Sequence, residues 1–308
     1  MNRQIQGGLL ALQLVLLLWL GLAFTWWLGI AIFGGFLFLL IGFQFYLSRK
    51  MSGGKNANLS NQVAGNFMPQ TMRLTTLQVC RAACQETVNC YRVFYFNQIF
   101  RVNAQWPDPS ENPKTLKKIP VLLLHGFFCN RGIWVDFAAE LADRGHWCEG
   151  ITLEPPFGSI SNYSQVIETA VEALITKTGA NKIALVGHSM GGLAARSYLR
   201  DFGSAKIAKV ITLGTPHQGT WFARLGHGVN AKEMGISSKW LDLLAQHEKQ
   251  SGVSALFTTI LTWYDNIVFP QGGQTIPGAK LLTVTGIGHV SMLFSNEVKD
   301  MVFKELKS

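Results

Sequence analysis

The chain has 308 residues and a formal net charge of +9, and 48% of its residues are hydrophobic. This length allows one catalytic-sized domain of about 190 residues plus an additional segment. The sequence contains five cysteines at irregular spacing, a pattern that fits neither a secreted disulfide framework nor a zinc motif, so we expect most of them to be small core residues: Cys80, Cys84, Cys90, Cys129 and Cys148.

Positive charge is concentrated in the N-terminal part of the chain. Residues 1–118 contain 11 Lys or Arg and 3 acidic residues, a balance of +8, whereas residues 119–308 contain 16 and 15. This distribution favours attraction to anionic lipid head groups. Nucleic acid is not expected as a partner, because the basic residues are spread thinly and no nucleic-acid-binding motif accompanies them.

The N-terminal segment predicts a membrane anchor over residues 1–50. Between Arg3 and Arg49 lie 45 uncharged residues. As a helix they would extend about 68 Å, roughly twice the ~30 Å hydrocarbon core of a bilayer, so two transmembrane helices fit better than one. We place them near 7–24 and 30–47, joined by a tight hairpin. A cleaved signal peptide is the alternative, but its apolar region should span only about 7 to 15 residues.

The flanking charges predict the orientation of this anchor. Arg3 precedes the apolar pair, Arg49, Lys50 and Lys55 follow it, and the hairpin tip carries no charge. Because positive flanks favour the cytoplasmic side, both ends of the pair and the rest of the chain are expected in the cytoplasm.

Residues 51–116 combine a linker with one amphipathic helix. The stretch 51–70 is rich in Gly, Asn, Ser and Gln, which is typical of a flexible linker. Apolar side chains then recur at steps of three and four residues, a helical period: Leu74, Leu77, Cys84, Val88, Tyr91 and Tyr95. This helix either lies on the membrane surface or packs on the following domain. A proline-rich segment at 106–113 marks the boundary before the domain at 117–308.

Strand and helix patterns alternate through residues 117–308. This alternation predicts an α/β fold with a mostly parallel sheet, helices on both faces, and a site at the carboxyl ends of the strands. The predicted strands are 120–124, 147–152, 182–187, 207–213, 256–263 and 281–286. The predicted helices are 132–144, 162–178, 190–202 and 294–307.

The segment from Lys182 to Arg196 predicts a strand, a tight turn and a helix, with Ser189 in the turn. The spacing Gly187-x-Ser189-x-Gly191 has a steric reason, because a nucleophile raised above a sheet needs a strained backbone and small neighbours. The pattern resembles the nucleophile elbow of α/β-hydrolases, and we predict Ser189 as the nucleophile.

The order of the triad in this fold is nucleophile, acid, histidine, which limits the remaining candidates. Five acidic residues after Ser189 still have a histidine to follow: Asp201, Glu233, Asp242, Glu248 and Asp265. Only Asp265 follows a strand-like run, at 256–264, so it is the predicted acid. His289 is then the single histidine left, in a glycine loop before the last helix, and is the predicted base.

The oxyanion of an acyl-transfer intermediate needs backbone N–H donors. Residues 121–124 predict a buried strand that ends in His125-Gly126, as expected for the first oxyanion loop. We predict the N–H groups of Phe127 and Met190 as the two donors of the oxyanion hole. His125 and His188 are expected to support the loops rather than to act as bases.

Together these motifs resemble bacterial triacylglycerol lipases and esterases of the α/β-hydrolase superfamily. The resemblance covers residues 117–308 and is carried by five elements: His125-Gly126-Phe127, Gly187–Gly192, Gly214-Thr215-Pro216-His217-Gln218-Gly219-Thr220, Asp265–Val268 and Gly288-His289. It implies a serine hydrolase that cleaves lipid-type acyl esters through a Ser-His-Asp triad. No cofactor is expected, and no set of metal ligands can be assigned.

The sequence leaves alternatives to an ester hydrolase open. An acyltransferase or a thioesterase would use the same triad, and a membrane scaffold would use none of its chemistry. The insertion 221–251 is either a lid over the acyl pocket or a packed helical excursion. Such lipases are commonly secreted, whereas the predicted anchor would retain this chain at a bacterial inner membrane, with a lipid or small acyl ester as substrate.

Overall fold

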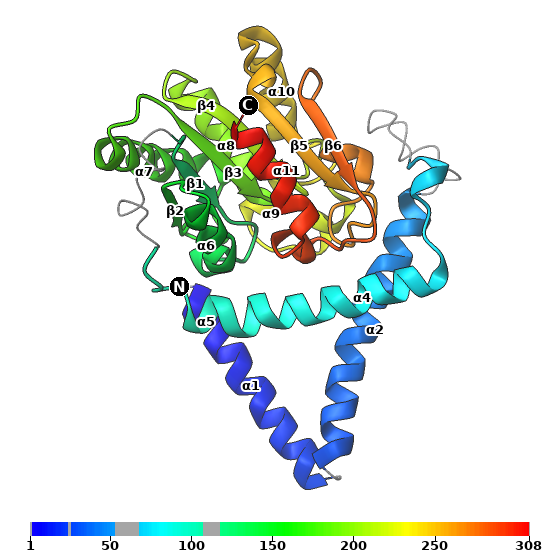
Figure 1. Cartoon of the computed structure of the whole chain (residues 1–308). Coiled ribbons are helices and arrows are strands. Elements are labelled where there is room, and N and C mark those ends of the chain that lie inside the picture. The colour runs from blue at the N-terminus through cyan, green and yellow to red at the C-terminus, as the bar shows by residue number, and fades with distance from the viewer. Residues whose placement is uncertain (1, 24–25, 53–67, 107–117, 308) are drawn as a thin grey trace.

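The computed structural model describes residues 2–23, 26–52, 68–106 and 118–307, and its centre is a parallel β-sheet (Figure 1). The sheet has six strands in the order β2-β1-β3-β4-β5-β6, and all neighbouring pairs are parallel. The strands are β1 (Val121–Leu124), β2 (Cys148–Ile151), β3 (Ile183–His188), β4 (Ile207–Leu213), β5 (Phe257–Thr262) and β6 (Lys280–Val284).

The predicted strands are confirmed, with ends that differ by two residues at most. Strands β1, β3 and β5 are buried along their whole length. Continuous burial is expected for strands that are covered on both faces, and β1 is accordingly an unbroken apolar run, whereas β5 buries three threonines as well.

Two layers of helices cover the sheet. On one face, α6 (Val135–Asp143) and α11 (Asn296–Lys307) contribute to one hydrophobic cluster. On the other, α7 (Tyr163–Thr178), α8 (Met190–Phe202) and α10 (Lys239–Ser251) contribute to a second. The start of the predicted helix 132–144 is instead a 3-10 turn, Arg131–Trp134, because the Asn130 side chain accepts from Gly132 N at 2.9 Å and caps it there.

Short helical segments connect these elements. They are η5 (Ile160–Asn162), η6 (Trp221–Leu225), α9 (Val229–Glu233), η7 (Val253–Leu256), η8 (Gln271–Gln274) and η9 (Val290–Leu293).

The N-terminal segment forms two helices, α1 (Asn2–Ala23) and α2 (Trp26–Ser52), which extend away from the sheet as a V (Figure 1). They coincide with the two predicted stretches, 7–24 and 30–47. Across the part of the chain that the structure describes, however, no helix has both the length and the apolarity required to span a bilayer. The expectation of two transmembrane helices is therefore not supported.

A third N-terminal helix, α4 (Thr76–Tyr91), lies between the V and the sheet domain (Figure 1). Short η1 (Gln70–Met72) precedes it, a capping box at Thr75 and Gln78 begins it, and the π-helix η2 (Arg92–Asn97) and α5 (Gln98–Phe100) continue it. Most of the predicted linker 51–70 lies outside the described residues, and so does the predicted boundary segment 106–113 except for Trp106.

Helix α4 packs on the catalytic domain, but not through its predicted apolar stripe. Its buried side chains are small or polar: Ala82, Ala83, Glu86, Thr87 and Asn89. Leu77 and Val88 of the stripe are instead 64% and 65% exposed. The sequence left open whether this stripe faces a membrane surface or the domain, because periodicity identifies an apolar face without showing what it contacts. Ala82 and Ala83 permit close approach to a cluster around Leu261, Trp263 and Tyr264.

The cysteines only partly follow the expectation of core positions. Cys129 and Cys148 are buried and Cys90 is half-buried, but Cys80 and Cys84 are exposed on α4; all five are free thiols.

Candidate active site

Ser189 lies in the turn between β3 and α8, with φ 54° and ψ −125°. A positive φ is uncommon for a residue with a side chain, so the surrounding structure must hold it in place. Part of this restraint is a hydrogen bond from Ser189 N to Leu213 O of β4, at 2.8 Å. The side chain is raised to the carboxyl edge of the sheet, as the elbow motif predicts.

The two glycines around Ser189 are sterically required. A Cβ at Gly187 would lie 2.5 Å from Gly192 N, and one at Gly191 would lie 2.1 Å from Leu124 O of β1. These distances are far below van der Waals contact. The glycines therefore allow the strand, the elbow helix and the neighbouring strand to approach one another.

Asp265 and His289 meet at the carboxyl ends of β5 and β6. His289 Nδ1 lies 2.9 Å from Asp265 Oδ2, and both side chains are almost fully buried. Asp265 Oδ1 accepts the N–H groups of Ile267 and Val268 at 2.9 and 2.6 Å. Gln274 Nε2 donates to Oδ2 at 3.0 Å, so the carboxylate is fixed from several sides.

The other candidate acids have different partners. Asp201 pairs with Arg200, Glu233 accepts from Ser159 and Ile160 N, and Glu248 pairs with Arg196. Asp242 lies in the first turn of α10. Asp265 is thus the acid that the structure brings to His289.

The electrostatic surroundings distinguish His289 from its neighbouring histidines. Burial lowers the pKa of His289, but the Asp265 carboxylate and Glu86 raise it by more, so that the pKa lies above its usual value. Burial lowers the pKa of His125 to about 4, and that of His188 well below its usual value. His289 is accordingly the histidine whose protonated form is stabilised.

His125 and His188 both have structural hydrogen bonds. His125 Nδ1 donates to Gly126 O at 2.8 Å and its Nε2 accepts from Leu153 N at 2.8 Å. His188 Nε2 donates to His289 O at 3.1 Å, and the two rings are 4.6 Å apart. These contacts agree with the expectation that both residues support loops.

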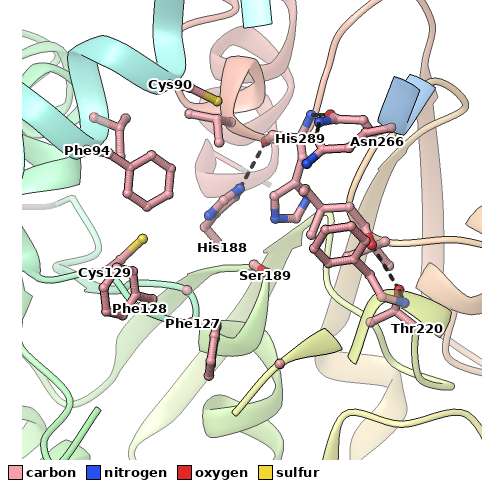
Figure 2. Close-up of a pocket in the computed structure, with 18 of the residues that line it drawn as sticks. Cys90, Phe94, Phe127, Phe128, Cys129, His188, Ser189, Thr220, Asn266 and His289 are labelled. Atoms are coloured by element: carbon pink, nitrogen blue, oxygen red, sulfur yellow. Dashed lines mark hydrogen bonds between the residues drawn. The ribbon is translucent and has the colours of Figure 1, made fainter. Parts of the chain in front are cut away.

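Ser189 and His289 open onto the same cavity, which has a volume of about 400 Å³. Figure 2 shows the His289 imidazole directed to the side of the pocket where Ser189 lies. Phe127, one predicted oxyanion donor, follows Gly126, whose Cβ would lie 2.9 Å from Ser189 Cβ. Met190, the other predicted oxyanion donor, is the first residue of α8.

The lining of this cavity is mostly apolar and comes from three parts of the chain. The N-terminal helices contribute Leu40, Ile41, Cys90, Val93, Phe94 and Tyr95. The loops of the sheet domain contribute Phe127, Phe128, Cys129, Ile267, Val268, Val290 and Leu293, and the insertion after β4 contributes Phe222, Ala223, Leu225, Gly226, Ala231 and Met234.

Several polar residues around the triad were not predicted from the sequence. Asn266 Oδ1 accepts His289 N at 3.0 Å, and its Nδ2 donates to Gln44 of α2 at 2.9 Å. Ser48 of α2 donates to Asp265 O at 2.6 Å. Glu86 of α4 binds the loop after His289. The sequence did carry a signal for Glu86, because it is the only acidic residue among residues 1–107.

The Thr215-Pro216-His217 element is part of a buried network. Arg196 of α8 pairs with Glu248 of α10 through two bonds of 2.6 and 2.8 Å, and donates to His217 O at 2.7 Å. His217 Nε2 lies 2.9 Å from Thr212 Oγ1. This network fastens α10, the second half of the predicted lid, to the elbow helix.

A serine at the β3–α8 turn, with an acid after β5 and a histidine after β6 of a parallel sheet, defines the α/β-hydrolase fold. Residues 119–250 match the alpha/beta hydrolase fold family. Triacylglycerol lipases of Pseudarthrobacter phenanthrenivorans and Burkholderia plantarii are each 33% identical to this chain over 184 residues. That region is 53% of this chain, and 57% and 51% of the two lipases, so the chain spans little more than half the length of these relatives.

Solved structures give the same fold. The mature form of a Bacillus licheniformis lipase superposes with a TM-score of 0.53 at 18% identity, covering 65% of this chain and 94% of that one. Aspergillus fumigatus lipase B gives a TM-score of 0.54 at 17% identity, covering 62% of this chain and 53% of that one. The family match begins at residue 119, so α1, α2 and α4 lie outside it.

Proposed function

We propose that the chain is a carboxylic ester hydrolase of the lipase and esterase type that acts through an acyl-enzyme on Ser189. The observation that carries this proposal is that His289, joined to the buried Asp265 at 2.9 Å, lines the same apolar cavity as a serine in a strained elbow. A positioned serine and imidazole are the two groups that acyl transfer requires.

In the acylation step, His289 Nε2 takes the proton of Ser189 as Oγ attacks the acyl carbon. Asp265 holds the imidazole in the tautomer with Nδ1 protonated and stabilises the imidazolium that forms. The N–H groups of Phe127 and Met190 stabilise the oxyanion. His289 then delivers the proton to the leaving alcohol, and a water activated by His289 releases the acid from Ser189 in a second cycle.

The lining supports lipid-type acyl esters as the substrate class. An acyl chain gains about 0.8 kcal/mol for each CH₂ group that it buries, and most side chains that surround this cavity are apolar. The similarity to triacylglycerol lipases supports the same class.

We assign the first half of the insertion, 221–234, as the mobile part of the lid predicted for 221–251. Phe222, Leu225 and Met234 line the cavity, and Leu225 is 67% exposed. Helix α10 contributes none of the described cavity lining and is fastened through Glu248. A chain without 226–234 should therefore change its acyl-length preference, and an unchanged preference in a folded protein would contradict a lid.

We also propose that the N-terminal helices hold the enzyme at a bacterial inner membrane, with the catalytic domain in the cytoplasm. Exposed apolar patches mark interaction surfaces, and basic residues favour anionic lipid. The exposed apolar side chains on α1, α2 and the α4 segment are Leu12, Leu14, Val15, Leu16, Phe36, Leu39, Leu40, Phe43, Tyr46, Leu77, Val88, Phe96 and Phe100. Recovery of the full chain in membranes tests the attachment, and digestion of the C-terminus from outside right-side-out vesicles would refute the orientation.

Covalent labelling with a fluorophosphonate tests the proposed activity directly. The full chain in detergent should be labelled at Ser189, as located by mass spectrometry, with no label in Ser189→Ala and much less in His289→Ala. Hydrolysis of a chain-length series of esters in the presence of a competing alcohol then distinguishes water from an alcohol as the acyl acceptor. A folded protein that is not labelled, with or without lipid, would favour a non-catalytic scaffold.

A further inference from the structure

Helix α4 places a buried carboxylate directly behind the candidate base. The Glu86 side chain is 0% exposed. Its Oε1 accepts Val290 N at 2.8 Å and its Oε2 accepts Ser291 N at 2.9 Å, so both oxygens hold the two residues that follow His289. Asn89, one turn further along α4, donates to Ser291 Oγ at 2.9 Å.

We propose that Glu86 is a positioning residue for His289, which holds the backbone after it and so fixes the imidazole between Asp265 and Ser189. This assignment rests on the ester hydrolase function proposed above. It extends the active site to a helix that lies outside the part of the chain matched by the hydrolase family.

Burying a carboxylate at this place costs free energy of folding, so its presence indicates a specific role. Burial raises the pKa of Glu86 above its usual value, and hydrogen bonds from the Ser291 hydroxyl and from Val290 N and Ser291 N reverse only part of this rise. Burying a charged group without partners costs several kcal/mol, and the backbone N–H groups offset this cost. A packing role alone would be filled better by an apolar side chain.

Three parts of the chain hold residues 289–291, and α4 is one of them through Glu86. Asn266 accepts His289 N, and His188 of β3 donates to His289 O. The loop approaches α4 so closely that a Cβ at Gly288 would lie 2.4 Å from Glu86 Oε2. The orientation of the imidazole follows the backbone at 289, which these bonds fix.

The charge of Glu86 also acts on His289. The titratable groups that face this imidazole are Asp265 from the loop after β5, Glu86 from α4 and His188 from β3. The two carboxylates raise the pKa of His289, whereas His188 stays neutral because burial lowers its own pKa. Loss of the Glu86 charge should therefore lower the pKa of His289.

The test uses Glu86→Gln in the full chain, with Thr87→Val as the matched control. Gln retains one acceptor for Val290 N but turns an amide donor toward Ser291 N. We expect kcat for a short-chain ester, per serine titrated with fluorophosphonate, to fall about tenfold, with KM changed less than about twofold. The acid limb of the kcat/KM profile should move to lower pH. Thr87 bonds within α4 to Ala83 O, and its variant should match the wild type in both measurements.

An unchanged kcat and an unmoved acid limb in folded Glu86→Gln would overturn the proposal, whatever the effect on thermal stability. If that variant does not fold, Glu86→Asp decides, because it keeps the carboxylate but is one methylene too short to reach both Val290 N and Ser291 N from α4. A fall in kcat of several-fold supports the proposal and an unchanged kcat refutes it. An unlabelled, inactive wild type would refute the ester hydrolase function itself, and this role with it.

Discussion

The contacts of Asp265 lead to a sharp prediction for Asp265→Asn. In the wild type, Oδ1 accepts Ile267 N and Val268 N, while Oδ2 faces His289 Nδ1 and Gln274 Nε2. The Asn oxygen should keep the two backbone bonds, which turns the amide NH₂ toward His289. The imidazole then accepts at Nδ1 and carries its proton on Nε2, so it can no longer take the proton of Ser189.

The expected loss in kcat is about 10⁴-fold, which corresponds to ~5.4 kcal/mol of transition-state stabilisation. Steady-state hydrolysis of a short-chain ester, with the fluorophosphonate labelling rate as a second readout, measures it. Asp201→Asn is the control, because Asp201 pairs with Arg200 on the surface and should leave kcat within about twofold. A value for Asp265→Asn within tenfold of wild type, in a folded protein, would refute the assignment of the acid.

Four further predictions follow from the packing and charge around the site. In the wild type, kcat/KM should rise with pH as His289 loses its proton, with a midpoint above 6.5 because its pKa is raised; a midpoint below that value would contradict the imidazole–carboxylate pair. Gly191→Ala should lower the free energy of unfolding by about 1–3 kcal/mol, because the new Cβ would clash with Leu124 O. Gly42→Ala is the control, because a Cβ there meets no atom within 4 Å. Equal free energies of unfolding for the two variants, measured by denaturant titration, would refute the clash at Gly191. Glu248→Ala should lower the free energy of unfolding by about 3–5 kcal/mol, because it leaves Arg196 buried and unpaired. Asp300→Ala, which breaks an exposed pair, should lower it by less than about 0.5 kcal/mol. Similar melting temperatures for the two variants would contradict this prediction. Phe94→Ala should enlarge the cavity and raise the relative kcat/KM for longer acyl chains, as measured on an ester series; a preference equal to that of wild type would show that Phe94 does not limit chain length.

The sheet domain was accessible from the sequence because its signals are local. Four of the strands, β1, β3, β4 and β6, end within two residues of a glycine, and the elbow needs small residues at fixed spacing from Ser189. Asp265 could be chosen because chain order and a preceding strand are both readable in one dimension. The same reasoning placed His289 in a loop after the last strand, where the structure has it.

The N-terminal contribution to the site could not be predicted because it depends on contacts between distant segments. Glu86 and Val290 are 204 positions apart, and Gln44 and Asn266 are 222 apart. Periodicity identified α4 as a helix, but it selected the stripe with Leu77 and Val88, which faces outward. The buried face is built from alanines and polar side chains whose partners exist only in the folded chain.

These contacts predict that the domain boundary placed at residue 117 does not separate a complete catalytic unit. A chain of residues 117–308 would lack Glu86, and with it the hydrogen bonds that hold Val290 and Ser291. It would also lack Ser48, which donates to Asp265 O, and would expose the face of Trp263 and Tyr264 that α2 and α4 cover.

We therefore expect this shorter chain to be labelled by fluorophosphonate at least about tenfold more slowly than the full chain, even where circular dichroism shows the sheet domain to be folded. Adding Glu86→Gln to the full chain should reproduce part of the loss, whereas adding Thr87→Val should reproduce none. Equal labelling rates for the two chain lengths would mean that the loops of Asp265 and His289 are held by the sheet domain alone. In that case the N-terminal helices would serve attachment and substrate access without shaping the chemistry.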